Sequence, residues 1–135
     1  MNITVESIVR APLAQVWSAY TTPDDIKQWN TASEDWHTTE STVDLRVGGV
    51  FSSRMEAKDG GFGFDFAGTY TRIEPHALIE YTFGGRTGVV EFISGPAGVT
   101  VRVTFEAESE NPEEMQRQGW QAILNNFAKH VEARL

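Results

Sequence analysis

The side chains that could do chemistry are few in this sequence and lie far apart. The three histidines, His37, His76 and His130, fall in different predicted elements, and there is no cysteine. None of their spacings matches a metal-ligand motif, so the sequence predicts neither a metal site nor a cofactor. His76 is expected on the surface of a turn. His130 borders an apolar helix face and could turn a ring nitrogen into a cavity.

The acidic side chains offer no clearer catalytic site. The pairs at 24–25 and 113–114 could act as acid and base, but each falls in the first turn of a predicted helix, where the helix dipole accounts for it. Glu34 and Asp35 lie in a loop near the predicted cavity mouth and could make polar contacts there. No nucleophile elbow, phosphate-binding loop or dinucleotide fingerprint occurs, so we assign no catalytic residue.

Charge and length narrow the class of protein. The net charge is −8 and no basic cluster offsets it, which disfavours nucleic acid and anionic membranes as partners. No apolar stretch approaches the roughly 20 residues that insert across a bilayer, and the N-terminus does not resemble a signal peptide. We therefore expect a cytoplasmic protein in which residues 1–135 form a single domain.

The sequence of residues 1–30 predicts a strand followed by two short helices. In "ITVESIVRA" the residues Ile3, Val5 and Val9 share one face, as in a strand. "APLAQVWSAY" carries apolar residues at helical spacing. A second helix restarts in "TTPDDIKQWN", with Thr22 as the expected N-cap and Pro23 in the first position.

The middle of the chain predicts strands separated by short, glycine-rich turns. Such short connections favour an antiparallel meander, and a sheet of this size is expected to curl. The six expected strands cover residues 36–47, 50–58, 62–74, 78–83, 88–94 and 98–108.

The C-terminal segment predicts one long amphipathic helix. Asn111 is expected to cap it, Pro112 to take the first position, and the helix could run to Leu135. This helix needs a large apolar surface to pack on, and the sheet is the only one available. Its apolar face, at 4-3-4 spacing, consists of Trp120, Leu124, Phe127 and Val131.

One glycine interrupts this helix, at a cost of roughly 1 kcal/mol relative to alanine. Gly119 precedes Trp120 at the border of the apolar face. The missing side chain could admit close packing of Trp17 or Tyr20, or a bound ligand, or a bend in the helix.

A curled sheet that grips a helix would enclose a space lined by aromatic and apolar side chains. Alternation along the strands and spacing on the helix select the residues expected to line it. The predicted ligand-binding residues are Trp29, Trp36, Phe51, Met55, Phe66, Tyr81, Phe92, Val103, Gly119, Trp120, Ile123, Phe127 and His130.

Four segments resemble the START-like (SRPBCC) superfamily: "RAPLAQVWSAYTTPDDIKQW", "DLRVGGVFSSRMEAKDG", "FAGTYTRIEPHALIEYTF" and "MQRQGWQAILNNFAKHVE". The similarity is greatest to the small bacterial group named after the activator of heat-shock protein 90 ATPase. The turn at 46–49 and the Gly119-Trp120 pair carry it most specifically. The resemblance implies an α+β helix-grip fold, in which a curved antiparallel sheet of about seven strands grips one long C-terminal helix, with two short helices after the first strand. It implies a cavity but no shared catalytic motif.

Three functions remain open on these grounds. The sequence favours a protein that binds a small hydrophobic or aromatic ligand and is not an enzyme. A polyketide cyclase or dehydratase would instead need an acid–base group in its cavity, for which Tyr81, His130 and Arg54 are candidates. A co-chaperone that stimulates a heat-shock ATPase by surface contact is suggested only by the name of the group. Exposed edge strands could also pair in a homodimer.

Overall fold

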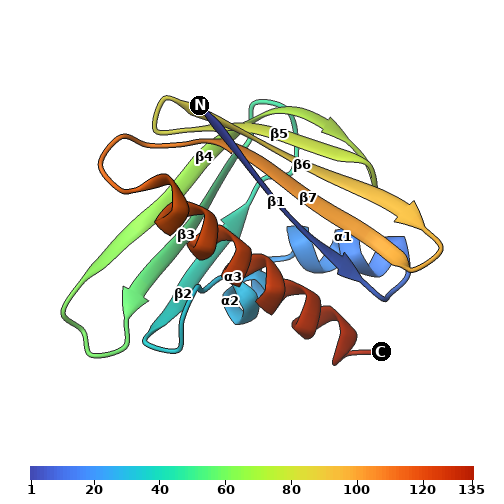
Figure 1. The fold of residues 1–135 in the computed structure, drawn as a ribbon, viewed down its shortest axis with the longest axis horizontal. Coiled ribbons are helices and arrows are strands. Elements are labelled where there is room, and N and C mark those ends of the chain that lie inside the picture. Colours follow the sequence, from blue (N-terminus) through green and yellow to red (C-terminus); the bar gives the residue numbers. More distant parts are fainter.

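The computed structural model describes residues 1–135 and contains one antiparallel sheet with three helices (Figure 1). The strand order is β1-β7-β6-β5-β4-β3-β2, so β2 to β7 form a meander and β1 pairs with the last strand. The predicted antiparallel meander and the expected number of strands are confirmed. The strands are β1 (Asn2–Val9), β2 (Trp36–Val43), β3 (Val50–Ala57), β4 (Gly63–Glu74), β5 (Leu78–Phe83), β6 (Arg86–Gly95) and β7 (Gly98–Glu106).

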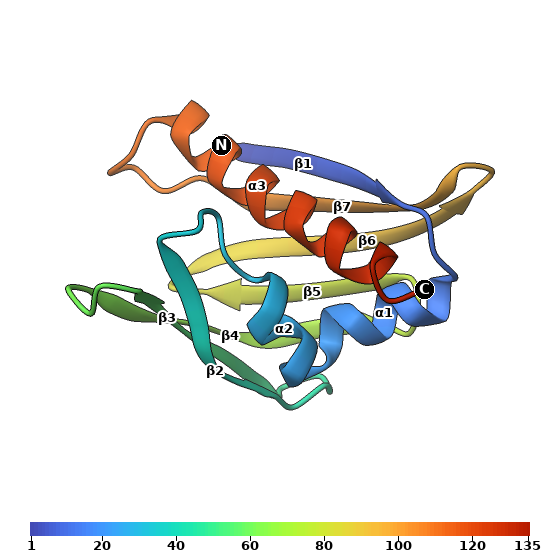
Figure 2. The ribbon, with the colours of Figure 1, turned by 90° about the horizontal axis from the view of Figure 1, so that it is seen from below.

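The three helices lie on the concave side of the curled sheet (Figure 2). They are α1 (Leu13–Thr21), α2 (Pro23–Trp29) and α3 (Glu113–Glu132). Helix α3 packs mainly along β1 and α2 along β2, which are the two edge strands of the sheet. The helices therefore close the open side of a half-barrel, and the predicted helix-grip fold is confirmed. None of the three helices combines the length and the hydrophobicity that a membrane span requires.

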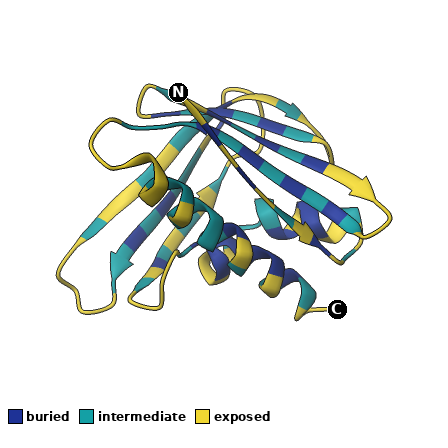
Figure 3. Cartoon of the chain, in the orientation of Figure 1, coloured by how far each residue is buried: buried dark blue, intermediate teal, exposed yellow.

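Alternation along the strands decides which side chains face the helices (Figure 3). In β7 every second residue is buried, namely Val99, Val101, Val103 and Phe105. The residues between them point outward, where Nε of Arg102 lies 2.8 Å from a carboxylate oxygen of Glu6 on β1. Because the side-chain period of a strand is two, the inner face of β7 follows directly from the sequence.

The expected start of the last helix is wrong by one residue and its expected end by three. Helix α3 begins at Glu113 and ends at Glu132, three residues before the C-terminus. Asn111 does not cap it, because its side-chain amide donates to a carboxylate oxygen of Glu108 instead. In the same segment, the side-chain amide of Gln116 donates to the backbone carbonyl of Asn111 at 2.9 Å. Helix α2 begins at Pro23 as predicted, although the Thr22 side chain makes no capping hydrogen bond.

The inner face of α3 changes character along its length. Leu124, Phe127, Ala128 and Val131 are buried, whereas Trp120 and Ile123 nearer the N-terminal end are only half-buried. Phe127 is fully buried, with its ring centre 4.9 Å from that of Trp29 and 5.2 Å from that of Tyr20. From Phe127 onward, the inner face of α3 is thus covered by side chains of α1 and α2.

Phe127→Ala should lower the free energy of unfolding by about 3–5 kcal/mol, because a fully buried aromatic ring is deleted. Urea titration measures the loss. Met115→Ala on the same helix is the matched control, since Met115 is 58% exposed and its removal should cost far less. A loss below about 1 kcal/mol for Phe127→Ala would contradict the packing of α3 described above.

Gly119 lies where nothing packs against it. A Cβ atom placed on this residue would meet no atom within 4 Å. Neither Trp17 nor Tyr20 approaches it, so the expectation of close packing at Gly119 is wrong. The φ angle of Gly119 is also not positive, unlike that of Gly48 or Gly60. The glycine is therefore not required here by either contact or conformation.

Gly119→Ala should raise the free energy of unfolding by roughly 0.5–1 kcal/mol, because alanine restricts the unfolded chain and favours the helix. A urea titration of this variant beside the wild type tests the gain. A clear loss of stability would mean that something contacts the Gly119 backbone closely.

Candidate functional site

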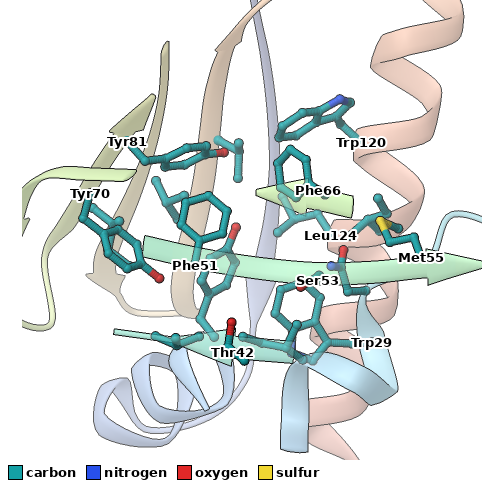
Figure 4. Close-up of a pocket in the computed structure, with 18 of the residues that line it drawn as sticks. Trp29, Thr42, Phe51, Ser53, Met55, Phe66, Tyr70, Tyr81, Trp120 and Leu124 are labelled. Atoms are coloured by element: carbon teal, nitrogen blue, oxygen red, sulfur yellow. The ribbon is translucent and has the colours of Figure 1, made fainter. Parts of the chain in front are cut away.

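A pocket of about 300 Å³ lies between the concave face of the sheet and the helices (Figure 4). Every strand except β1 contributes to its wall, together with all three helices. It reaches the surface beside Phe64, which is 41% exposed. The lining residues are Tyr20, Ile26, Trp29, Asn30, Thr42, Val43, Phe51, Ser53, Met55, Phe64, Phe66, Tyr70, Ile79, Tyr81, Arg86, Val90, Val103, Trp120, Ile123 and Leu124.

Two glycines within strands allow aromatic rings to lie against the sheet. Gly88 on β6 faces Tyr81 on β5, and Gly68 on β4 faces Phe51 on β3. A Cβ atom on Gly88 would lie 2.6 Å from Cζ of Tyr81, and one on Gly68 would lie 2.7 Å from Cζ of Phe51. Such distances are too short for carbon atoms, so each ring occupies the place of the missing side chain. The rings thereby leave the middle of the half-barrel open.

Eight of the thirteen residues predicted to bind a ligand line this pocket. They come from α2, from strands β3, β4, β5 and β7, and from the half-buried part of α3. Their ligand-binding role stays a prediction, but the structure brings them together around one space. The eight are Trp29, Phe51, Met55, Phe66, Tyr81, Val103, Trp120 and Ile123.

Two further predicted residues face inward but touch only other side chains. The ring of Phe92 lies 5.1 Å from that of Trp17 and 5.6 Å from that of Tyr20. Phe127 packs against Trp29 as described above. Both are on the correct face, yet they lie where helices α1 and α2 already fill the half-barrel.

The other three predicted residues lie outside the pocket wall. Trp36 is one ring away from it, since its ring centre lies 5.8 Å from that of Phe64 at the mouth. Gly119 faces open space. His130 points between helices instead, where its Nε2 lies 2.8 Å from a carboxylate oxygen of Asp25 on α2. Glu34 and Asp35, considered for polar contacts, are exposed and do not line the pocket.

Twelve lining residues were missed by the sequence analysis, and they include most of the polar ones. All three tyrosines of the chain line the pocket, although only Tyr81 was predicted to do so. Gly68 and Gly88 mark close approaches within the strands, but to Phe51 and Tyr81, which were already predicted, so they gave no signal for Tyr20 or Tyr70. The twelve are Tyr20, Ile26, Asn30, Thr42, Val43, Ser53, Phe64, Tyr70, Ile79, Arg86, Val90 and Leu124.

The pocket wall holds a single charged side chain. Arg86 is the only lining residue with a charge, in a protein whose net charge is −8. Its guanidinium group lies 4.4 Å from the ring centre of Phe83 and donates to the carbonyl of Glu106 at 2.9 Å. No carboxylate, histidine or lysine borders the space.

Burial alters the acidity of all three tyrosines. It raises the pKa of Tyr70 to about 12, from an ordinary value of 10. Burial also holds the pKa of Tyr20 and of Tyr81 well above 10, and the neighbouring phenols add to the effect. The three side chains are therefore neutral hydrogen-bond donors at any physiological pH.

Only one of the three acid–base candidates lies in the pocket. Arg54 is on the outer side of the sheet, where it pairs with Glu56 at 3.1 Å and with Asp65 at 3.6 Å. His130 contacts Asp25, and Tyr81 alone lines the space. Nowhere in residues 1–135 do three or more His, Cys, Asp or Glu side chains gather closely enough to hold a metal ion.

An alkaline titration tests the burial of the tyrosines. In the native protein, near-ultraviolet absorbance of tyrosinate should stay low through pH 10 and rise only towards pH 12 and above. In concentrated urea the same groups should titrate near pH 10. The unfolded chain then releases protons that the native chain keeps, so stability is intact below pH 10 and falls as the pH rises from 10 towards 12. Half-titration at pH 10 in a still-folded sample would contradict the burial.

Comparison with known proteins identifies the family to which the chain belongs. The sequence model of the family described as "Activator of Hsp90 ATPase homolog 1-like protein" matches residues 10–132. A search of curated proteins gave no match.

Solved structures share the fold over nearly the whole chain. A solution structure of an AHSA1-like protein from Aeromonas hydrophila is 47% identical, with a TM-score of 0.93, and the match covers 99% of this chain and 94% of that one. A solution structure from Cytophaga hutchinsonii is 40% identical, with a TM-score of 0.85 and coverage of 98% and 93%. A crystal structure from Chromobacterium violaceum is 25% identical, with a TM-score of 0.86 and coverage of 98% of both chains. The chain therefore belongs to the family of Activator of Hsp90 ATPase homolog 1-like proteins, within the START-like (SRPBCC) superfamily.

Proposed function

We propose that this protein binds a small, largely apolar molecule in the pocket between the sheet and α3. The observation that carries the proposal is the pocket itself, an open space of about 300 Å³ with sixteen hydrophobic residues among its twenty lining residues. An apolar cavity of roughly half that size is enough to hold benzene. A ligand with two aromatic rings therefore matches the space in size and in chemistry.

The expected affinity follows from the apolar surface that the ligand removes from water. Burial contributes about 25 cal/mol per Å² of apolar surface. A ligand that buries roughly 300 Å² gains about 7 kcal/mol before the entropic cost of association, which places realistic dissociation constants in the micromolar range.

The pocket chemistry supports a binding role over catalysis. A cyclase or dehydratase needs a group that can take up and release a proton near neutral pH. Of the candidates Tyr81, His130 and Arg54, only Tyr81 borders the space, and its raised pKa keeps it protonated. A co-chaperone role has only the family name in its support, and no surface residue is assigned to it. Homodimer formation and a cytoplasmic location likewise stay predictions.

Binding can be tested by narrowing the pocket. N-phenyl-1-naphthylamine is a neutral probe whose fluorescence rises in apolar surroundings, and we expect the wild type to bind it with micromolar affinity. Ile123→Trp adds a ring to the α3 wall of the pocket and should weaken binding at least tenfold. The matched control is Asn125→Trp, which adds the same ring to the exposed side of α3 and should leave binding unchanged.

Urea titration of both variants separates lost binding from lost folding. A wild type that binds neither this probe nor a panel of neutral two-ring molecules would overturn the proposal. So would an equal loss of binding in Ile123→Trp and Asn125→Trp, because the probe would then occupy the outer surface.

A further inference from the structure

Three phenol groups border the pocket without a partner in the protein. Tyr70 and Tyr81 are only 7% and 6% exposed, and Tyr20 adds a third ring from α1. None of their hydroxyls hydrogen-bonds to another group of the chain. The only fully enclosed side-chain polar atom without a partner is Oγ of Ser41, so the phenol oxygens are in contact with the open space. Figure 4 shows the hydroxyls of Tyr70 and Tyr81 pointing into the pocket.

Three elements direct these side chains into the same pocket. Tyr70 and Tyr81 are directly opposite each other on β4 and β5, so their side chains leave the same face of adjacent strands. Tyr20 lines the same pocket from α1. Gly88 allows the Tyr81 ring to lie flat on β6, which fixes the direction of its hydroxyl.

A buried hydroxyl without a partner is costly, and a ligand atom can remove that cost. A phenol taken from water without a compensating hydrogen bond is disfavoured. A site built to hydrogen-bond a ligand oxygen rejects the analogue that lacks it, because the buried groups then stay unpaired. Unpaired hydroxyls in a pocket wall can therefore affect the choice of ligand as well as its affinity.

The charges around the pocket decide which partner the tyrosines need. The phenols stay protonated, so each has an O–H group to donate. The only charge in the wall is the positive one of Arg86, and no carboxylate is present to accept from a ligand donor or to pair with a cation. Arg86 lies against the ring of Phe83 and donates one hydrogen bond to the Glu106 carbonyl. A neutral acceptor oxygen fits these conditions.

We propose that the pocket selects a neutral aromatic molecule that carries a carbonyl oxygen, and that this oxygen accepts one or two hydrogen bonds from the pocket-facing hydroxyls of Tyr20, Tyr70 and Tyr81. The inference rests on the proposed function, since it assigns the polar part of the same ligand. The rings of such a molecule lie among the aromatic side chains of β3, β4 and α3, and its carbonyl group is directed to the tyrosine end of the pocket.

A matched pair of probes tests the hydrogen bonds from the tyrosines separately from binding in the pocket. Benzophenone and diphenylmethane have the same two rings and differ in the carbonyl oxygen. We expect the wild type to bind benzophenone about tenfold more tightly, as a net hydrogen bond allows. The ratio should fall towards one in Tyr70→Phe and Tyr81→Phe, and further in the double variant, while diphenylmethane binding is retained. The carbonyl stretching frequency of bound benzophenone should be lowered in the wild type and less so in these variants.

The outcomes are distinguishable because phenylalanine keeps the ring and removes only the hydroxyl. Ser53→Ala removes a rival hydroxyl from the same wall, and Ser94→Ala, which removes an exposed hydroxyl outside the pocket, should leave the ratio unchanged. If both probes bind the wild type equally, or if Ser53→Ala lowers the ratio and the tyrosine variants do not, the assignment to the tyrosines is overturned while the pocket remains a binding site. If neither probe binds, the proposed function fails and the assignment fails with it.

Discussion

The pocket depends on two pairs in which a glycine and an aromatic residue face each other across neighbouring strands. Gly88 lies opposite Tyr81, and Gly68 lies opposite Phe51. If either glycine carried a Cβ atom, the facing ring would have to leave the sheet, since the two would be under 3 Å apart. Both rings line the pocket, so the two glycines help to set its shape.

The fold was readable from the sequence because its signals are local. Each strand of the meander ends at a short turn, and the burial pattern of β7 repeats with the period of two that its sequence shows. The inner face of the sheet follows from that period, which is why Phe51, Met55, Phe66 and Val103 were placed correctly. The limits of α3 were less accurate because Asn111 had another partner available in Glu108.

The sequence did not show which inward-facing residues line the pocket and which are covered by a helix, because this depends on contacts between distant segments. Phe92 and Phe66 both face the helices, but Phe92 is covered by Trp17 and Tyr20 from α1 and Phe66 borders the open space. The period of apolar residues in a sequence shows which side of a helix or strand faces the core. It does not show which segment packs against that side. His130 shows the same limit, since its partner Asp25 is 105 positions away in the chain. Sequence reasoning therefore found the wall of the half-barrel and could not separate its filled end from its open end.

The open end also collects the polar groups that a filled core would exclude. A well-packed interior avoids both voids and unpaired hydroxyls, because each lowers stability. Here the unpaired phenols of Tyr20, Tyr70 and Tyr81 and the one arginine of the wall all border the same space, while the acidic residues that give the chain its charge of −8 lie elsewhere. The same rings could have been buried as phenylalanine without loss of packing. In the proposed function, these hydroxyls contribute to binding because a ligand brings an acceptor to them.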